Sequence, residues 1–180
     1  MFLKLINVYK FIFIIFTVIG YSMTVSSNDN ILLLELKDGI VTIELKPGVA
    51  PNHVSRIKEL VNEGFYDGLK FHRVIAGFMA QTGDPQGNGT GGSGTNLKAE
   101  FNNERHLRGT LSMARARDPN SADSQFFICL EDAPHLNGQY TVWGQVLDGM
   151  EYVDNIKKGE GNNGAIIGEP DIIVSMKMKK

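Results

Sequence analysis

From residue 31 onward the chain alternates between hydrophobic and polar positions in short runs, a pattern that predicts mostly strands. Two aliphatic runs, 31–36 and 40–45, flank Lys37-Asp38-Gly39, and Asp-Gly between two such runs is typical of a β-hairpin. Further strand-like runs, separated by glycine-rich stretches, cover residues 71–79, 109–114, 124–130, 140–146 and 171–177.

Helical spacing is found in two places only. In the first, 51–64, Pro51 suits the opening turn, the apolar residues fall on one face and Gly64 closes the helix. The second runs from Met150 to about residue 159. Many short strands with two helices predict a mainly-β fold, a closed antiparallel β-barrel, and exclude the regular strand–helix alternation of a parallel α/β sheet.

The N-terminus has a different character. Lys4 and Lys10 precede an apolar stretch over 11–21, which is the pattern of a secretory signal. We expect residues 1–25 to be a signal peptide, with an uncleaved membrane anchor as the alternative. Residues 26–30 are polar and predict a linker, which leaves one domain over 31–180.

Composition narrows the possible functions. The 180 residues are 42% hydrophobic and carry a formal net charge of −2, so a full core is possible and the basic surface that nucleic acid requires is not expected. Cys129 is the only cysteine, which excludes an intramolecular disulfide. It lies in an apolar run, and we expect a buried core residue and not a reactive thiol.

Several familiar site patterns fail. Residues 87–92 match the dinucleotide-binding string G-x-G-x-x-G, but Asp84-Pro85 precedes them and no helix follows, as that site would require. Residues 91–95 lack the last glycine of a nucleophile elbow. The four histidines show no paired ligand spacing, so we expect no metal and no cofactor.

Three other segments resemble the cyclophilin signature. They read FHRVIAGFMAQTGD (71–84), SMARA with NSADSQFFI (112–116 and 120–128), and LNGQYTVWG (136–144). The resemblance spans roughly residues 31–177. It implies a cyclophilin-type peptidyl-prolyl cis-trans isomerase of a bacterial-like branch. The fold it implies, a closed eight-stranded antiparallel barrel capped by two α-helices, agrees with the hydrophobic pattern.

The resemblance also implies the site. It puts the catalytic arginine at Arg73, whose guanidinium can donate a hydrogen bond to the prolyl nitrogen when the twisted amide frees its lone pair. Phe78 and Gln81 complete the catalytic set, Gln81 as the partner that holds Arg73. The residues implied to bind substrate are His72, Met79, Ala114, Arg115, Ala116, Gln125, Phe127, His135, Leu136 and Tyr140.

The alternation of a strand separates two neighbouring phenylalanines. Gln125 and Phe127 fall on one face of their strand and Phe126 on the other. Because the resemblance places Phe127 in the substrate groove, we expect Gln125 beside it there, and we assign Phe126 and Trp143 to ordinary packing.

Three positions depart from the pattern common in eukaryotic members. His135 replaces a tryptophan, Tyr140 a histidine and Arg115 an asparagine. Without the indole donor at 135 we expect weak cyclosporin binding. The charge of Arg115 should bias the preference for residues that flank proline, and activity should survive all three changes.

The sequence thus predicts a monomeric, exported isomerase that acts on proline-containing unfolded or extended polypeptides. The alternative is a proline-peptide binding module with little turnover. We expect a bacterial periplasmic location, with membrane contact only through the N-terminal segment. Anchorage in the inner membrane facing the periplasm, or a secretory pathway in a eukaryote, are the alternatives.

Overall fold

A computed structural model describes residues 27–180, so the predicted signal peptide or anchor over 1–25 lies outside the described residues. Within the predicted linker, Ser27–Asn30 forms a single 3-10 turn (η1) that leads directly into the first strand. Across residues 27–180 no helix has the length and apolar character needed to span a bilayer.

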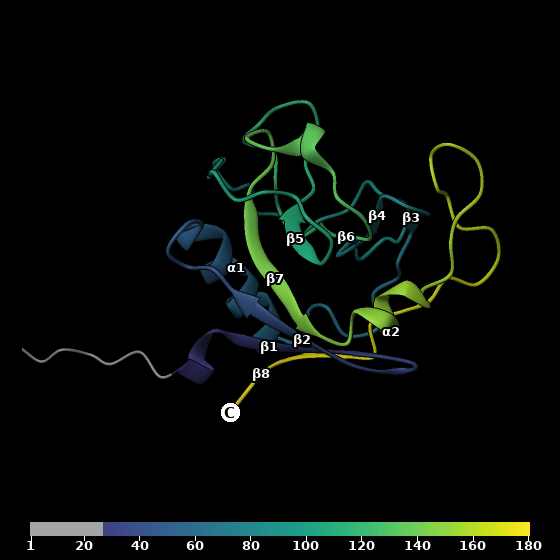
Figure 1. Cartoon of the computed structure of the whole chain (residues 1–180), viewed down its shortest axis with the longest axis horizontal. Coiled ribbons are helices and arrows are strands. Elements are labelled where there is room, and N and C mark those ends of the chain that lie inside the picture. The colour runs from purple at the N-terminus through teal and green to yellow at the C-terminus, as the bar shows by residue number, and fades with distance from the viewer. Residues whose placement is uncertain (1–26) are drawn as a thin grey trace, which may run out of the picture.

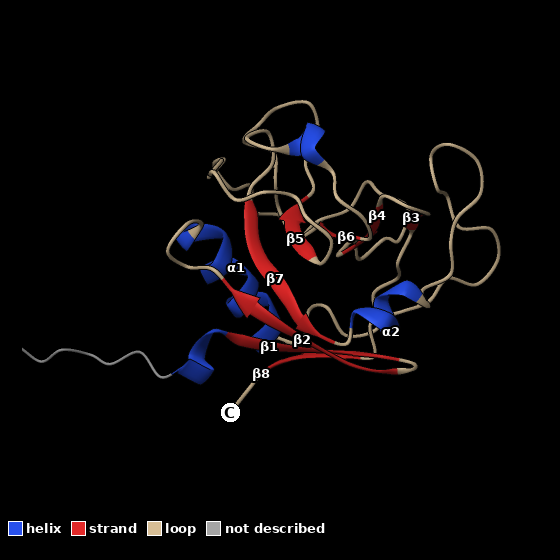
Figure 2. Ribbon diagram, viewed as in Figure 1, coloured by secondary structure: helices blue, strands red, loops and turns tan. Residues whose placement is uncertain are grey.

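Eight antiparallel strands form one strongly curled sheet in the order β3-β4-β6-β5-β7-β2-β1-β8 (Figure 1). The strands are β1 (Ile31–Leu36), β2 (Gly39–Leu45), β3 (Arg73–Ile75), β4 (Met79–Thr82), β5 (Thr110–Met113), β6 (Phe126–Cys129), β7 (Val142–Asp148) and β8 (Ser175–Met178). The helices are α1 (Pro51–Asn62), α2 (Met150–Asp154) and the short 3-10 helix η2 (Pro134–Leu136). The mainly-β prediction is therefore confirmed, and Figure 2 shows how much of the remaining chain is long loop.

The prediction of a closed barrel is wrong, because the end strands β3 and β8 do not pair with each other. Segments just before them are joined instead: Lys70 forms an isolated bridge with Ile172, and the Phe71 N–H donates to the Asp171 carbonyl over 2.9 Å. The outer edge of β3 is already occupied by a loop, since Val74 bonds to Gly164 and Gly159. Both backbone groups of Val74 on this edge are thus already bonded, and a longer last strand could not pair with them.

Two boundaries differ from the sequence prediction for the same reason. The last strand begins at Ser175 and not at residue 171, because residues 171–173 bond to the segment before β3. The second helix ends at Asp154 and not near residue 159. Beyond it, the Gly159 N–H donates to the Val74 carbonyl, so this stretch serves β3 instead of extending the helix.

The main core is one cluster of buried side chains from the curled sheet, helix α1 and the segments that join them. The first hairpin pairs Leu34 with Val41, and alternate residues along both of its strands are buried. Helix α1 adds Ile57 and Leu60, both essentially inaccessible to solvent. The alternating pattern of the sequence therefore describes this half of the molecule correctly.

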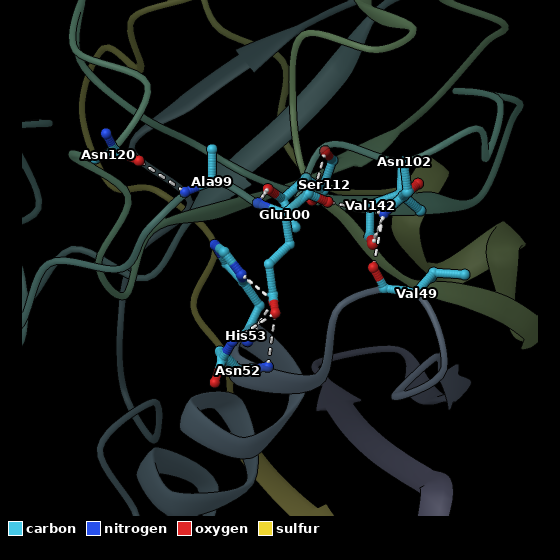
Figure 3. Close-up of polar contacts among 10 residues, drawn as sticks. Val49, Asn52, His53, Ala99, Glu100, Asn102, Ser112, Asn120 and Val142 are labelled. Carbon is cyan, nitrogen blue, oxygen red and sulfur yellow. Dashed lines mark hydrogen bonds and ion pairs between the residues drawn. The ribbon is translucent and has the colours of Figure 1, made fainter.

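Helix α1 begins without a side-chain cap of its own, since Ala50 is its N-cap residue. The carboxylate of Glu100, from a distant loop, accepts hydrogen bonds from the backbone N–H of Asn52 (3.1 Å) and of His53 (3.0 Å), as Figure 3 shows. Glu100 also receives a bond from the Asn52 side chain (2.7 Å), and its own N–H donates to Thr141 Oγ1 (3.0 Å). A negative group at a helix N-terminus is favourable, so Glu100 fastens α1 to the chain that enters β7.

Candidate active site

A cavity of about 170 Å³ opens where β3, β4 and β6 meet the η2 segment. Nine residues line it, and every one of them belongs to the set predicted from the sequence. They are Arg73, Phe78, Met79, Gln81, Ala114, Arg115, Phe127, Leu136 and Tyr140. The fold thus gathers residues from positions 73 to 140 around one hollow.

The floor of this cavity is a small apolar cluster, separate from the main core. It consists of Met79, Phe127, Cys129, Ala133 and Leu136. Along β6, Phe127 and Cys129 face this cluster, while Phe126 and Ile128 belong to the main core. The predicted division between Phe126 and Phe127 is confirmed.

Arg73 lies at the start of β3, directly opposite Gln81 of β4. Its Nη1 donates to Gln81 Oε1 over 3.2 Å, and its Nε donates to the Asn163 carbonyl oxygen over 2.9 Å. In the described part of the chain, no carboxylate forms an ion pair with Arg73. The guanidinium is therefore held in place without being neutralised, and it keeps N–H groups that can serve a ligand.

Two glutamine side chains extend the hydrogen-bond network from Arg73 to the glycine-rich loop. Gln81 Nε2 donates to Gln125 Oε1 over 2.9 Å. Gln125 Nε2 in turn donates to the carbonyl oxygens of Gly89 (3.1 Å) and Gly91 (2.8 Å). Because each amide both donates and accepts, the orientation of Gln81 toward Arg73 is fixed by the loop over 83–94.

A second cavity, of about 280 Å³, adjoins the first and shares Gln81, Ala114 and Arg115 with it. Its other lining residues come mainly from glycine-rich and polar loops, namely Gly89, Thr90, Gly91, Gly92, Asn96, Ala116, Ser121, Asp123 and Gln125. The Asp123 carboxylate already accepts the backbone N–H of Ser93 (3.0 Å) and of Gly94 (2.8 Å). The two cavities together can accommodate a proline ring and a side chain beside it.

Arg115 stands at the junction of the two cavities. Its guanidinium carbon lies 4.6 Å from the centre of the Tyr140 ring, within the range of a cation–π contact. Its Nη2 donates to the Gln139 carbonyl oxygen (3.0 Å) and its Nη1 to that of Ala116 (3.0 Å). Like Arg73, it has no carboxylate partner among the ion pairs of residues 27–180.

Two of the predicted binding residues line neither cavity. His72 lies beside Gly89 with both ring nitrogens buried and unbonded, and burial lowers its pKa, which favours the neutral ring. His135 is exposed and packs at the rim, its ring centre 5.4 Å from that of Phe78. Ala116 and Gln125 line only the second cavity.

One residue beneath the site was missed by the sequence prediction. His106 is buried and stacks against Phe127, with ring centres 6.2 Å apart, and it meets the edge of Tyr140. Its Nε2 lies 3.0 Å from Ser112 Oγ, and burial lowers its pKa. No local signal could have revealed it, because it comes from a loop without regular structure and the rings that it contacts, Phe127 and Tyr140, are distant in sequence.

Across residues 27–180, no group of three or more His, Cys, Asp or Glu side chains is arranged to hold a metal ion. The groups that the site does offer are a fixed cation, two oriented amides and an apolar slot.

Known proteins with the same features are numerous. Residues 31–178 match the family model described as "Cyclophilin type peptidyl-prolyl cis-trans isomerase/CLD". A probable peptidyl-prolyl cis-trans isomerase from Brucella abortus is 54% identical over 171 residues, covering 87% of either chain. Peptidyl-prolyl cis-trans isomerase B from Bacillus subtilis is 50% identical over 116 residues, covering 63% of this chain and 80% of its own.

Solved structures agree. A Cryptosporidium parvum cyclophilin, crystallised in the presence of the dipeptide Ala-Pro, superposes with a TM-score of 0.76 at 31% identity, over 83% of this chain and 99% of its own. A cyclophilin from Hirschia baltica gives a TM-score of 0.74 at 31% identity, over 84% of this chain and 74% of its own. With the cavity and its residues matching the signature, the chain belongs to the cyclophilin-type peptidyl-prolyl cis-trans isomerases.

Proposed function

We propose that Arg73, Phe78 and Gln81 form the catalytic set of this isomerase and that its clients are proline-containing segments of unfolded or extended proteins. The main support is the position of Arg73, whose guanidinium is fixed beside an apolar floor and is not neutralised by any carboxylate of the described chain. A proline ring on that floor brings its nitrogen toward the cation.

The chemistry follows from the peptide bond itself. Resonance gives the C–N bond partial double-bond character, so rotation about X-Pro takes about 10–100 s without a catalyst. Halfway through rotation the resonance is lost and the prolyl nitrogen regains a lone pair. A hydrogen bond from Arg73 to that lone pair exists only in the twisted state, so it lowers the barrier without tightening ground-state binding.

The remaining residues take supporting roles. Met79, Phe127, Leu136 and Tyr140 wall the proline slot, and Phe78 covers it from the rim. The backbone around Ala114, together with Arg115, Ala116 and Gln125, faces the chain that flanks proline. His72 and His135 border the groove and transfer no proton, since the reaction requires none.

The magnitude required is moderate. To bring isomerisation into the millisecond range, the enzyme must lower the barrier by about 6–7 kcal/mol. Removal of a single donor aimed at the transition state typically lowers kcat by about 10²–10³-fold. One charged hydrogen bond therefore supplies a large part of the effect, and desolvation in the apolar slot supplies more.

The test compares wild type with Arg73→Ala and with Arg105→Ala, whose exposed side chain lines neither cavity. We expect Arg73→Ala to lower kcat by about 10²–10³-fold with little change in KM, because the interaction is made only in the transition state. Arg105→Ala should match wild type. Turnover of a proline peptide can be followed by NMR exchange or by coupled proteolysis.

The alternative, a binding module, gives a different result in the same experiment. Wild type would bind the peptide but isomerise it no faster than buffer, and Arg73→Ala would change nothing. That outcome would contradict the catalytic proposal.

We also propose that residues 1–25 direct export, to the periplasm in a bacterium, and that the domain acts as a monomer with weak affinity for cyclosporin. Anchorage through an uncleaved segment is the alternative. The mass of the mature N-terminus separates cleavage from anchorage, and sedimentation of the purified domain reports its oligomeric state. For cyclosporin, His135→Trp should strengthen binding, because it restores the indole donor at the rim.

A further inference from the structure

The outer edge of β3 is covered by a short loop segment, residues 159–165, that follows α2. The Val74 N–H donates to the Gly164 carbonyl and the Gly159 N–H donates to the Val74 carbonyl, each over 2.8 Å. Ala165 forms an isolated bridge with Arg73. Figure 1 shows this part of the chain, in yellow, running out past β3. The segment thus takes the place that a neighbouring strand would have.

The same segment reaches the Arg73 side chain. The Asn163 carbonyl oxygen accepts the hydrogen bond from Arg73 Nε at 2.9 Å, while Gln81 accepts the one from Nη1. The two acceptors come from different elements, one from the sheet and one from the loop. An arginine side chain is flexible, and a planar fork bound at two points can be neither tilted nor withdrawn without breaking a bond.

Two glycines allow the close packing of this segment, one against β3 and one within the segment itself. At Gly164, where φ is +68°, a Cβ atom would collide with the Ile75 side chain and lie 2.8 Å from the Val74 carbonyl oxygen. At Gly159 a Cβ atom would collide with the Gly164 carbonyl. The segment therefore fits against β3 only because Gly164 lacks a side chain, and its two ends approach each other only because Gly159 lacks one.

The base of the loop is pinned independently of β3. Lys157 Nζ donates to the carbonyl oxygens of Ile167 (2.7 Å) and Glu169 (3.1 Å), and the Lys157 N–H donates to the Asp171 carboxylate (2.7 Å). A change at 159 or 164 can therefore move the tip of the loop while its two ends stay in place.

We infer that the 159–165 segment is a positioning element for catalysis, which sets the Arg73 guanidinium through the Asn163 carbonyl. This inference rests on the proposed role of Arg73. The segment lies along the outer edge of β3 and lines neither cavity, so it acts through Arg73 and not by contact with substrate. It fixes the position and orientation of the Arg73 guanidinium, and a displacement of a catalytic group by about 1 Å can lower a rate by about 10²-fold.

The test uses two different ways to displace the Asn163 carbonyl and one matched control. Gly164→Ala pushes the segment away from β3 at a positive φ, whereas Gly159→Ala, without that strain, forces residues 159 and 164 of the segment apart. Gly168→Ala is the control, because Gly168 has a similar φ of +74° but only one atom, Lys157 Nζ at 3.7 Å, near the added Cβ. We expect the first two variants to lower kcat by about 10- to 100-fold with KM within about twofold, and the control to match wild type.

A second readout separates positioning from general damage. The Arg73 Nε–H resonance, assigned with Arg73→Lys, should shift and exchange faster with water in Gly164→Ala and Gly159→Ala, and not in Gly168→Ala. In an Arg73→Ala background, Gly159→Ala should change the residual rate by less than about twofold, because the contact it disturbs is already gone.

Three results would overturn the inference. Full activity in both Gly159→Ala and Gly164→Ala would show that the contact does not matter. Equal losses in the control would show an effect of backbone strain. Additive losses in the Arg73→Ala background would show that the segment acts by another route. The Nε–H resonance does not depend on turnover, so the contact can be tested even if Arg73→Ala proves as active as wild type, a result that would refute the proposed function instead.

Discussion

Strand β6 carries two neighbouring phenylalanines into two different regions of the molecule. Phe126 faces the interior and meets Trp143 and Tyr66 edge-on, with ring centres 5.3 and 5.5 Å away. Phe127 faces the groove and packs against His106 and Tyr140. Both are nearly inaccessible to solvent, at 0% and 5% exposure. Burial alone therefore does not separate a residue that holds the fold from one that binds a ligand; its neighbours do.

The most direct test of this division between interior and groove is to replace each phenylalanine with alanine in turn. We expect Phe126→Ala to lower the free energy of unfolding by about 3–5 kcal/mol, since the interior cannot close around the lost ring. Phe127→Ala should lower it by about 1–2 kcal/mol, because water can enter the open groove, and should reduce kcat/KM by about tenfold or more. Urea unfolding and the isomerase assay measure the two effects. Equal losses of stability would refute the division.

The interior region also depends on how α1 is held, which Glu100 can test. Glu100→Gln removes the charge at the helix N-terminus and should lower the free energy of unfolding by about 1–2 kcal/mol, with little effect on kcat. Glu59→Gln, on the exposed face of the same helix, is the control and should stay within about 0.5 kcal/mol of wild type.

The same residue predicts a pH dependence. Burial alone would raise the pKa of Glu100, but the hydrogen bonds from His53 and Asn52 outweigh it and lower the pKa below its ordinary value of 4.5. A depressed folded-state pKa stabilises the fold above pH 4.5 and loses that contribution as the pH falls through the folded-state value. Chemical unfolding between pH 7 and pH 3 should show this decline in wild type and a smaller one in Glu100→Gln.

Changes to the charged residues of the groove should alter selectivity and not stability. Arg73 and Arg115 both line the cavity without a carboxylate partner in the described chain, so we expect the groove to favour acidic clients. We expect a peptide with Glu beside proline to be turned over about three- to tenfold faster than its Lys counterpart at low salt. Arg115→Gln should reduce this ratio, Arg115→Lys should retain most of it, and added salt should weaken it. A ratio insensitive to both charge and salt would exclude Arg115 as a selectivity residue.

The smallest expected effect concerns the reactivity of Cys129, which lies between the interior and the groove. Cys129 lies on the groove side of β6, fully buried, and burial raises the pKa of its thiol to about 12. We expect no reaction with Ellman's reagent in the native protein and one thiol per chain in denaturant, because the thiolate is the reactive form. Rapid labelling of the native protein would show that the groove floor opens to solvent.

The parts of this structure that the sequence could predict are those set by local pattern. The hairpin over 31–45, helix α1 and the two faces of β6 follow from alternation and helical spacing, and the groove residues follow from signature strings. The ends of α2 and β8 could not be predicted, because there the backbone bonds to segments distant in sequence. The same is true of Glu100, which bonds to His53, 47 residues away, and of Asn163, which bonds to Arg73, 90 residues away. It is also true of His106, whose aromatic partners Phe127 and Tyr140 come from later segments of the chain.

The pairing of β1 with β8 has a consequence for folding during synthesis. Leu34 of β1 lies opposite Met176 of β8, so the first strand cannot complete its pairing until the last strand has been synthesised. At typical elongation rates the ribosome needs roughly ten to thirty seconds to synthesise the residues between them. During that time one edge of β1 is bare and the sheet is incomplete. If the chain is exported as we propose, such late completion would keep the polypeptide unfolded enough to pass through a membrane channel.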